Sequence, residues 1–387
     1  MVEDNDTYDG DTVAERLAVI LGYHEESKHH FGRMAPSLGY MDWANQPAPF
    51  RHYQGCETIA LPLMGEDPEL GYEALFSAPE SSPAPVTRES LGRVLALSFG
   101  LSAWKASGAS RWALRMVPSS GNLHPTEAYV IVCPGKRGNA AEAIPGGISH
   151  YNPRDHSLER RLAVEGALAE GFAEAFQPPG VWIACTSIFW REAWKYGLRA
   201  YRYCQLDMGH ALTGLAVAAR LCNWHCRLVP GVLPEQLTQL LGLDRQRLPK
   251  AEWEHAECLC QLGPADQSPT RVDLSTAISH IGSSAFAGTP NQLSQQHENW
   301  PGIEKVARQA STHFSEPPPA NLFQGPVAPG PSPGQAITVI RKRRSAVAYD
   351  PRVEMPYDAF MAIISRCLPH RHRPPFGAGP TQPAVHL

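Results

Sequence analysis

The feature that most constrains this chain is the segment at 201–221, which is apolar on most faces of a helix. Leu206, Leu212 and Leu215 recur at helical spacing. Glycines and alanines stand between them and are small enough to let other backbones pack close. A helix that is apolar on most faces belongs in the interior of a protein. We therefore expect a core helix around which the remaining elements are arranged.

Strand and helix patterns are mixed along the chain. β-Branched, aromatic and apolar runs predict strands at 128–133, 180–189, 226–232 and 254–262, and a hairpin that joins 147–152 to 156–162. Further helices are predicted at 87–100, 164–176 and 234–241. The order shows no regular βαβ alternation, so the predicted fold class is α+β.

Changes in composition divide the 387-residue chain into four parts. We expect a helical and irregular extension at 1–86, a main lobe at 87–263, a linker rich in Pro, Ser and Gly at 264–335, and the start of a second lobe at 336–387. The last part ends where a strand is expected, at 384–387. A lobe that stops at its first strand cannot bury its own core, so it should dock on the main lobe or be incomplete.

Composition also excludes several classes of protein. Hydrophobic residues make up 43% and charged residues 19% of the chain, which suits a globular core. A net charge of −4 leaves no basic stripe for nucleic acid. No secretory signal and no membrane-length apolar run is evident, and the nine cysteines indicate free thiols. We expect a cytoplasmic protein without nucleic-acid or membrane partners.

A loop of small residues precedes the predicted strand at 128–133. It consists of Pro118, Ser119, Ser120, Gly121 and Asn122. Such a loop exposes backbone N–H groups and hydroxyls, which suit the polar edge of a flavin. A plain turn capped by Ser and Asn has the same composition, so the residues alone leave both interpretations open.

Four consecutive cations at 341–344 are followed by Ser345. A guanidinium such as that of Arg343 can bind a phosphate bidentately, and a serine hydroxyl adds a hydrogen bond. A solvated basic helix face, or a nucleic-acid patch, explains the same run of charge.

Several motifs between about 90 and 262 resemble the nitroreductase superfamily. The run Pro-Ser-Ser-Gly-Asn-Leu-His-Pro-Thr-Glu at 118–127 resembles its flavin-facing loop. The hairpin at 149–159 and the run at 195–210 resemble the branch of azoline-oxidising dehydrogenases from peptide natural-product pathways. Several matches in the right order are more specific than one. The resemblance implies a nitroreductase-like fold, with a central, mostly antiparallel sheet flanked by helices and a partial second lobe.

The resemblance further implies an FMN-dependent oxidoreductase. In that family Arg and Ser hold the FMN phosphate, and Arg343 and Ser345 match this motif, whereas 70–76 contains no Arg-Arg-Ser. Family flavins lie at a dimer interface, which implies a pseudo-dimer or homodimer in which 118–122 reach the ring from the other lobe. Val347 stands where the family usually has a Lys or Arg near the flavin ring.

Three polar residues near the expected start of the core helix, Lys195, Tyr196 and Arg202, can line a substrate pocket or form a salt-bridge surface. No metal site is predicted. The cysteines and histidine at 222, 225, 226, 258 and 260 include no Cys-x-x-Cys pair.

Two functional hypotheses follow. The first is an FMN-dependent oxidoreductase acting on a peptide, or on a small molecule such as a nitroaromatic or quinone, with an unspecified electron donor or acceptor. The second is a non-catalytic nitroreductase-fold scaffold that has lost its flavin, which Val347 and the incomplete second lobe favour. The paired motifs favour the enzyme, since a scaffold has no need to match both ends of a flavin.

Overall fold

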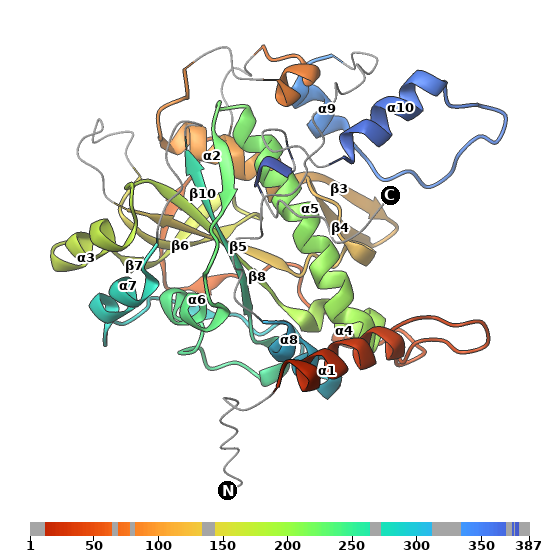
Figure 1. Ribbon diagram of the computed structural model, residues 1–387, viewed down its shortest axis with the longest axis horizontal. Helices are drawn as coiled ribbons and strands as arrows, with labels where there is room; N and C mark the ends of the chain where they lie inside the picture. The colour runs from red at the N-terminus through yellow and green to blue at the C-terminus, as the bar shows by residue number, and fades with distance from the viewer. Residues whose placement is uncertain are drawn as a thin grey trace, which may run out of the picture.

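A computed structural model describes residues 12–63, 69–77, 82–133, 144–263, 272–311, 334–368, 374 and 376–378. A seven-stranded sheet lies at its centre (Figure 1). All neighbouring strands in it are antiparallel. Their order is β2 (Glu57–Ala60), β7 (Ser157–Ala163), β6 (Gly147–Asn152), β5 (Thr126–Val132), β8 (Val181–Ser187), β10 (His255–Gly263) and β9 (His225–Leu228).

Helices cover both faces of this sheet. On one face the core is shared with α2 (Arg88–Ser98) and α5 (Ala200–Arg220). On the other face it is shared with α3 (Ala167–Ala175), α6 (Pro234–Leu241) and α7 (Leu274–Ile281). A third apolar cluster joins α1 (Val13–Glu26), α4 (Phe189–Tyr196) and α8 (Pro301–Ala310) near the start of α5.

Smaller elements complete the described chain. Two short ladders lie outside the main sheet: β1 (Tyr53–Gln54) with β11 (Thr289–Pro290), and β3 (Leu101–Ser107) with β4 (Ser110–Arg115). Helices α9 (Ala336–Lys342) and α10 (Tyr357–Arg366) come last. The 3-10 turns are η1 (Trp43–Asn45), η2 (Tyr72–Phe76), η3 (Ser120–Asn122), η4 (Gly197–Arg199), η5 (Lys250–Glu252) and η6 (Phe376–Ala378).

The predicted fold class is confirmed: the molecule is α+β, with an antiparallel sheet between helices. The core helix is α5, whose Ala211, Leu215 and Ala219 are buried against the sheet. Leu206 is 57% exposed, however. The helix therefore buries one side rather than most of its faces, because it covers the sheet from outside instead of passing through the interior.

The region expected to be a linker, 264–335, contains folded structure. Helices α7 and α8 lie within it, and their Ile281 and Ile303 are buried. Residue types common in loops serve here as helix starts: Asp273 accepts hydrogen bonds from the first turn of α7, and Pro301 occupies the first turn of α8. Residues 264–271 and 312–333 lie outside the described part.

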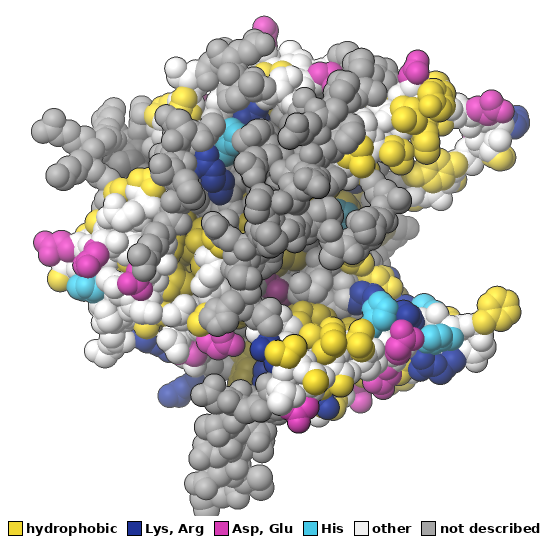
Figure 2. Space-filling view, in the orientation of Figure 1, with side chains coloured by type: hydrophobic (Ala, Val, Ile, Leu, Met, Phe, Trp, Pro, Cys, Tyr) yellow, Lys and Arg dark blue, Asp and Glu magenta, His cyan; other side chains and the backbone are white. Residues whose placement is uncertain are grey.

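The chain from 336 onward divides into a docked part and a projecting part. Helix α9 buries Ala336 and Ile337 in the same core as α2 and α5. Helix α10 stands away from the sheet, and apolar side chains gather over it (Figures 1 and 2), among them the exposed Tyr357 and Phe360. The strand expected at 384–387 lies outside the described residues. No described helix is both long and apolar enough to cross a membrane.

Buried charges link the sheet to α4. The guanidinium of Arg191 donates to Glu127, and His150 lies between Glu127 (3.0 Å) and Glu159 (2.9 Å). All four side chains are buried. Burial alone would lower the pKa of His150, but the bonds and charges of the two carboxylates outweigh it and raise the pKa to about 9. Burial opposes ionisation of Glu127 too, yet Arg191 and His150 hold its pKa well below its usual value.

These shifts predict a pH dependence of stability. The His150 pKa is raised from 6.5 to about 9, so its contribution to the free energy of unfolding is complete below pH 6.5 and is lost as pH rises through 9. We expect the stability difference between wild type and His150→Gln, measured by urea unfolding, to shrink over that interval. A difference that stays constant with pH would contradict this assignment.

Candidate functional site

The loop at 117–124 joins β4 to β5 and is held by a carboxylate of α5. Asp207 accepts hydrogen bonds from Ser119 Oγ (2.7 Å), Ser120 Oγ (3.0 Å) and the backbone N–H of Ser120 (3.1 Å). Asn122 Nδ2 donates to the carbonyl of Ala113 (2.9 Å). The hydroxyls expected to face a ligand are therefore engaged with the protein itself. What the loop still offers is its backbone around Gly121.

Gly121 is the point at which α4 meets this loop. Its φ is +60°, a left-handed conformation that glycine adopts without strain. A Cβ atom at this position would lie 2.8 Å from Tyr196 Oη and 3.1 Å from Lys195 Nζ. Two of the three predicted substrate-pocket residues therefore lie directly over the predicted cofactor loop.

The groups around Tyr196 keep its phenol protonated. Burial, together with the nearby Glu192 carboxyl, raises the pKa of Tyr196 to about 12. The Lys195 ammonium lies 5.3 Å and the Arg199 guanidinium 5.4 Å from the centre of its ring. The Tyr196 hydroxyl is thus a potential proton donor beside two cations at neutral pH.

Arg202, the third predicted pocket residue, lies elsewhere. Its guanidinium donates to Ser27 Oγ (2.9 Å) and to the carbonyl of His24 (3.1 Å). These bonds tie the end of α1 to α5. The structure does not bring Arg202 to the loop, and it supports the alternative structural interpretation of this residue.

The cationic segment after α9 approaches the same loop from the other end of the sequence. Arg343 Nη2 donates to the carbonyl of Met116 (3.2 Å), two residues before Pro118. Arg344 donates to the carbonyl of Arg341 (2.7 Å) and reaches Ser102 (3.5 Å). Burial and the charge of Arg344 lower the pKa of Arg343. Ser345 is exposed and has no hydrogen bond within the described residues.

The space beneath the loop is too small for a cofactor. A cavity of about 20 Å³ lies there, lined in part by Pro118, Ser119 and Asp207.

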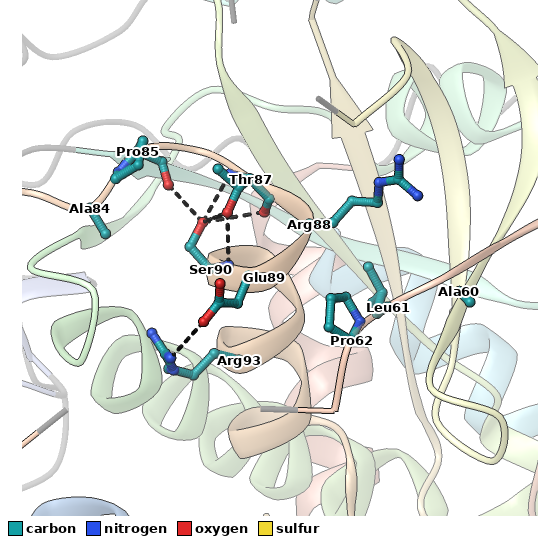
Figure 3. Close-up of a pocket in the computed structure, with 10 residues that line it drawn as sticks. All are labelled: Ala60, Leu61, Pro62, Ala84, Pro85, Thr87, Arg88, Glu89, Ser90 and Arg93. Atoms are coloured by element: carbon teal, nitrogen blue, oxygen red, sulfur yellow. Dashed lines mark hydrogen bonds and ion pairs between the residues drawn. The ribbon is translucent and has the colours of Figure 1, made fainter. Parts of the chain in front are cut away.

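A larger hollow of about 700 Å³ lies at the start of α2 (Figure 3). Its polar groups serve the helix itself, because Thr87 and Ser90 form the N-terminal cap and Arg93 pairs with Glu89 (3.2 Å). It is separate from the loop. Among the described residues, no group of His, Cys, Asp or Glu is arranged to hold a metal ion.

Comparison with known proteins identifies the domain that contains the loop. Residues 82–262 match the model of the nitroreductase family. The chain carries a nitroreductase-family domain. The domain includes the loop at 118–122, Lys195, Tyr196 and Asp207, and it ends well before Arg343.

One curated relative is the trifolitoxin-processing protein TfxB of Rhizobium leguminosarum bv. trifolii, 28% identical over 152 residues. The match covers 36% of this chain and 39% of the relative, so the chain spans about two fifths of the relative's length.

A solved structure described as a nitroreductase shares this fold. It comes from Anabaena variabilis and superposes with a TM-score of 0.60 at 24% identity, over 89% of this chain and 67% of that one. The Escherichia coli microcin synthetase McbBCD complex with truncated pro-MccB17 gives a TM-score of 0.37 at 15% identity, over 66% of this chain and 95% of that one. The second likeness is too weak to carry an argument.

Sequence reasoning did not single out Asp207 as a residue that holds the loop. It appeared only as part of the motif at 195–210, without a partner. A polar residue in a mostly apolar helix is a signal that it needs a buried partner, but only the fold shows that this partner is Ser119–Ser120.

A glycine substitution tests the packing of α4 on the loop. Gly121→Ala should lower the free energy of unfolding by roughly 1–2 kcal/mol, because alanine is strained at positive φ, and should also displace Tyr196. Gly108→Ala is the matched control, since its φ is +57° but no atom lies within 4 Å of the added Cβ. Urea unfolding and the NMR signals of the Tyr196 ring measure both effects. A Tyr196 ring that is unchanged in Gly121→Ala would contradict the contact.

Proposed function

We propose that this protein is an FMN-dependent oxidoreductase, with the flavin lying against the loop at 118–122 and its phosphate toward Arg343. The approach of Arg343 to Met116 carries the proposal. The loop at 118–122 suits the flavin ring, and Arg343 suits the phosphate. They are separated by more than two hundred residues in the chain, yet the bond from Arg343 to Met116 brings them together. Both belong to the same protomer, so the phosphate contact needs no second copy.

The residues present fit an anionic cofactor. Arg343 and Arg344 are neighbouring cations, and neither forms an ion pair with a carboxylate of the described residues. Arg343 Nε is buried without a hydrogen-bonding partner in the same part of the chain. A phosphate group would supply both the missing acceptor and the missing negative charge. Gly121, which lacks a side chain, leaves its backbone accessible on the outer side of the loop.

When bound, FMN supplies two-electron redox chemistry. Lys195 would stabilise negative charge that develops next to the loop, because its ammonium lies over Gly121. Tyr196, with a pKa of about 12, would hold a proton at Oη and donate a hydrogen bond to a substrate lying beside the exposed Gly121. Arg343 and Arg344 would anchor the phosphate.

We further propose a peptide as the substrate class, consistent with the azoline-oxidising branch. The similarity to a trifolitoxin-processing protein supports this choice, although it covers only 36% of this chain. A small nitroaromatic or quinone is the alternative. Both would meet the same Lys195 and Tyr196 side chains.

A second candidate is a scaffold of the same fold that binds no flavin. The exposure of Ser345 and Val347 favours it, since Val347 is 95% exposed and neither residue contacts the loop in the described chain.

FMN titration of the purified protein, followed by its absorption spectrum, separates the two candidates. We expect stoichiometric binding that weakens about tenfold or more in Arg343→Ala, as expected for the loss of a charge-assisted phosphate contact. Arg352→Ala is the control, because Arg352 is exposed and pairs only with Asp350 (2.8 Å) in the described chain. A wild-type protein that binds no FMN would contradict the oxidoreductase and support the scaffold. Equal weakening of FMN binding in both variants would show that Arg343 does not contact the phosphate.

A further inference from the structure

Two neighbouring carboxyl groups meet where the loop is anchored, Asp207 on α5 and Glu192 on α4. Asp207 is buried and accepts hydrogen bonds from the hydroxyls of Ser119 and Ser120 and from the N–H of Ser120. Surroundings made of donors favour an ionised carboxylate. Asp207 therefore holds the loop by accepting these hydrogen bonds.

Glu192 has the opposite surroundings. Its side chain is fully buried, no donor reaches either carboxylate oxygen among the described residues, and the Asp207 carboxylate lies within hydrogen-bonding reach of it. An ionised carboxylate without partners in a protein interior is strongly disfavoured. Burial and the neighbouring Asp207 raise the pKa of Glu192 well above its usual value. The titratable and charged groups that face it are Arg191, Lys195 and Tyr196 on α4, and Cys204 and Asp207 on α5.

Arg191 forms no ion pair with Glu192 in the described structure, although its charge opposes the rise in the pKa of Glu192. Its guanidinium is engaged with Glu127 and with the carbonyl of His124 (2.7 Å). Lys195 extends toward Gly121 rather than pairing with Glu192 in the described structure. Neither cation therefore forms an ion pair with Glu192 in the described structure.

We infer that Asp207 is the positioning residue of the loop at 119–121 and that Glu192 is kept as a neutral acid beside Asp207, so that ionisation of Glu192 releases the loop. The inference rests on the proposed function only in that this loop would hold the flavin. A second buried negative charge beside Asp207 would repel it. The Asp207 carboxylate can then separate from Glu192 only by giving up its bonds to Ser119 and Ser120.

Ionisation of Glu192 should destabilise the folded protein. Because the folded-state pKa of Glu192 is raised, the unfolded chain ionises first, and native stability falls as pH rises above the ordinary glutamate value of 4.5. Glu192→Gln, which resembles the neutral acid, should therefore be as stable as wild type near pH 4.5 and more stable at neutral and alkaline pH. A variant that removed a needed charge would instead be less stable than wild type at all these pH values.

The loop itself is monitored by amide hydrogen exchange of residues 119–123 in the flavin-free protein, corrected for the intrinsic pH dependence of exchange. In wild type, protection should decrease at alkaline pH. In Asp207→Asn it should be reduced at least tenfold already at neutral pH, because charge-assisted hydrogen bonds are lost. In Glu192→Gln, the neutral-pH protection should remain and the alkaline loss should disappear. Glu170→Gln on the exposed side of α3 is the control and should behave as wild type.

If Asp207→Asn does not fold, the double variant Ser119→Ala, Ser120→Ala removes the hydroxyl donors without altering the interior. Unchanged loop protection in Asp207→Asn or in the double variant would overturn the positioning role. An alkaline loss that persists in Glu192→Gln, or lower stability of that variant at every pH, would overturn the neutral acid. These measurements use no flavin. A protein that binds no FMN but shows the expected exchange would refute the proposed function alone.

Discussion

The pairing of Glu127 with Arg191 is the interaction on which the rest of the structure depends. Glu127 lies on β5, the strand that follows the loop, and Arg191 lies on α4. Arg191 also donates to the carbonyl of His124, the last part of the loop, and His150 of β6 bonds to Glu127 from the other side. Removing either partner would leave an unpaired charge in the interior, which strongly destabilises the folded state. One guanidinium therefore fixes the position of α4 relative to both the sheet and the loop.

The candidate site follows from that placement. Because α4 is fixed, Lys195 and Tyr196 lie over Gly121, and Glu192 lies beside Asp207. Helix α5 holds the loop through Asp207. The loop at 119–121 is thus held between two helices, one supplying groups on its outer side and the other supplying its anchor. Its position is decided by the buried charges together with its own Ser119 and Ser120, which bind Asp207.

The cationic segment at 341–344 lies outside the residues that match the nitroreductase family. The family match ends at residue 262, whereas Arg343 reaches Met116 from a helix that packs on α2 and shares its core. Helix α9 accordingly has a structural and a proposed functional part. Ala336 and Ile337 dock it, and the docking brings the following cations to the entrance of the loop. Ser345, at the end of the same motif, is exposed to solvent. Only part of the motif therefore lies at the loop.

The sequence by itself determined the elements whose signal is local. Helix α6, the β6–β7 hairpin and the core helix α5 were predictable because periodicity, turn residues and caps act over a few positions. The loop at 118–122 could be proposed as a site from its resemblance to a family, and Lys195 and Tyr196 with it. The short helix α4 was missed, because it directly follows a buried strand and the strand predicted at 180–189 extended into its first residue. Only the tertiary structure decided that Arg202 serves α1 and that the loop's hydroxyls belong to Asp207. Hydrogen-bond partners and the cost of burying charge depend on which segments meet in space, and a linear pattern does not contain that information.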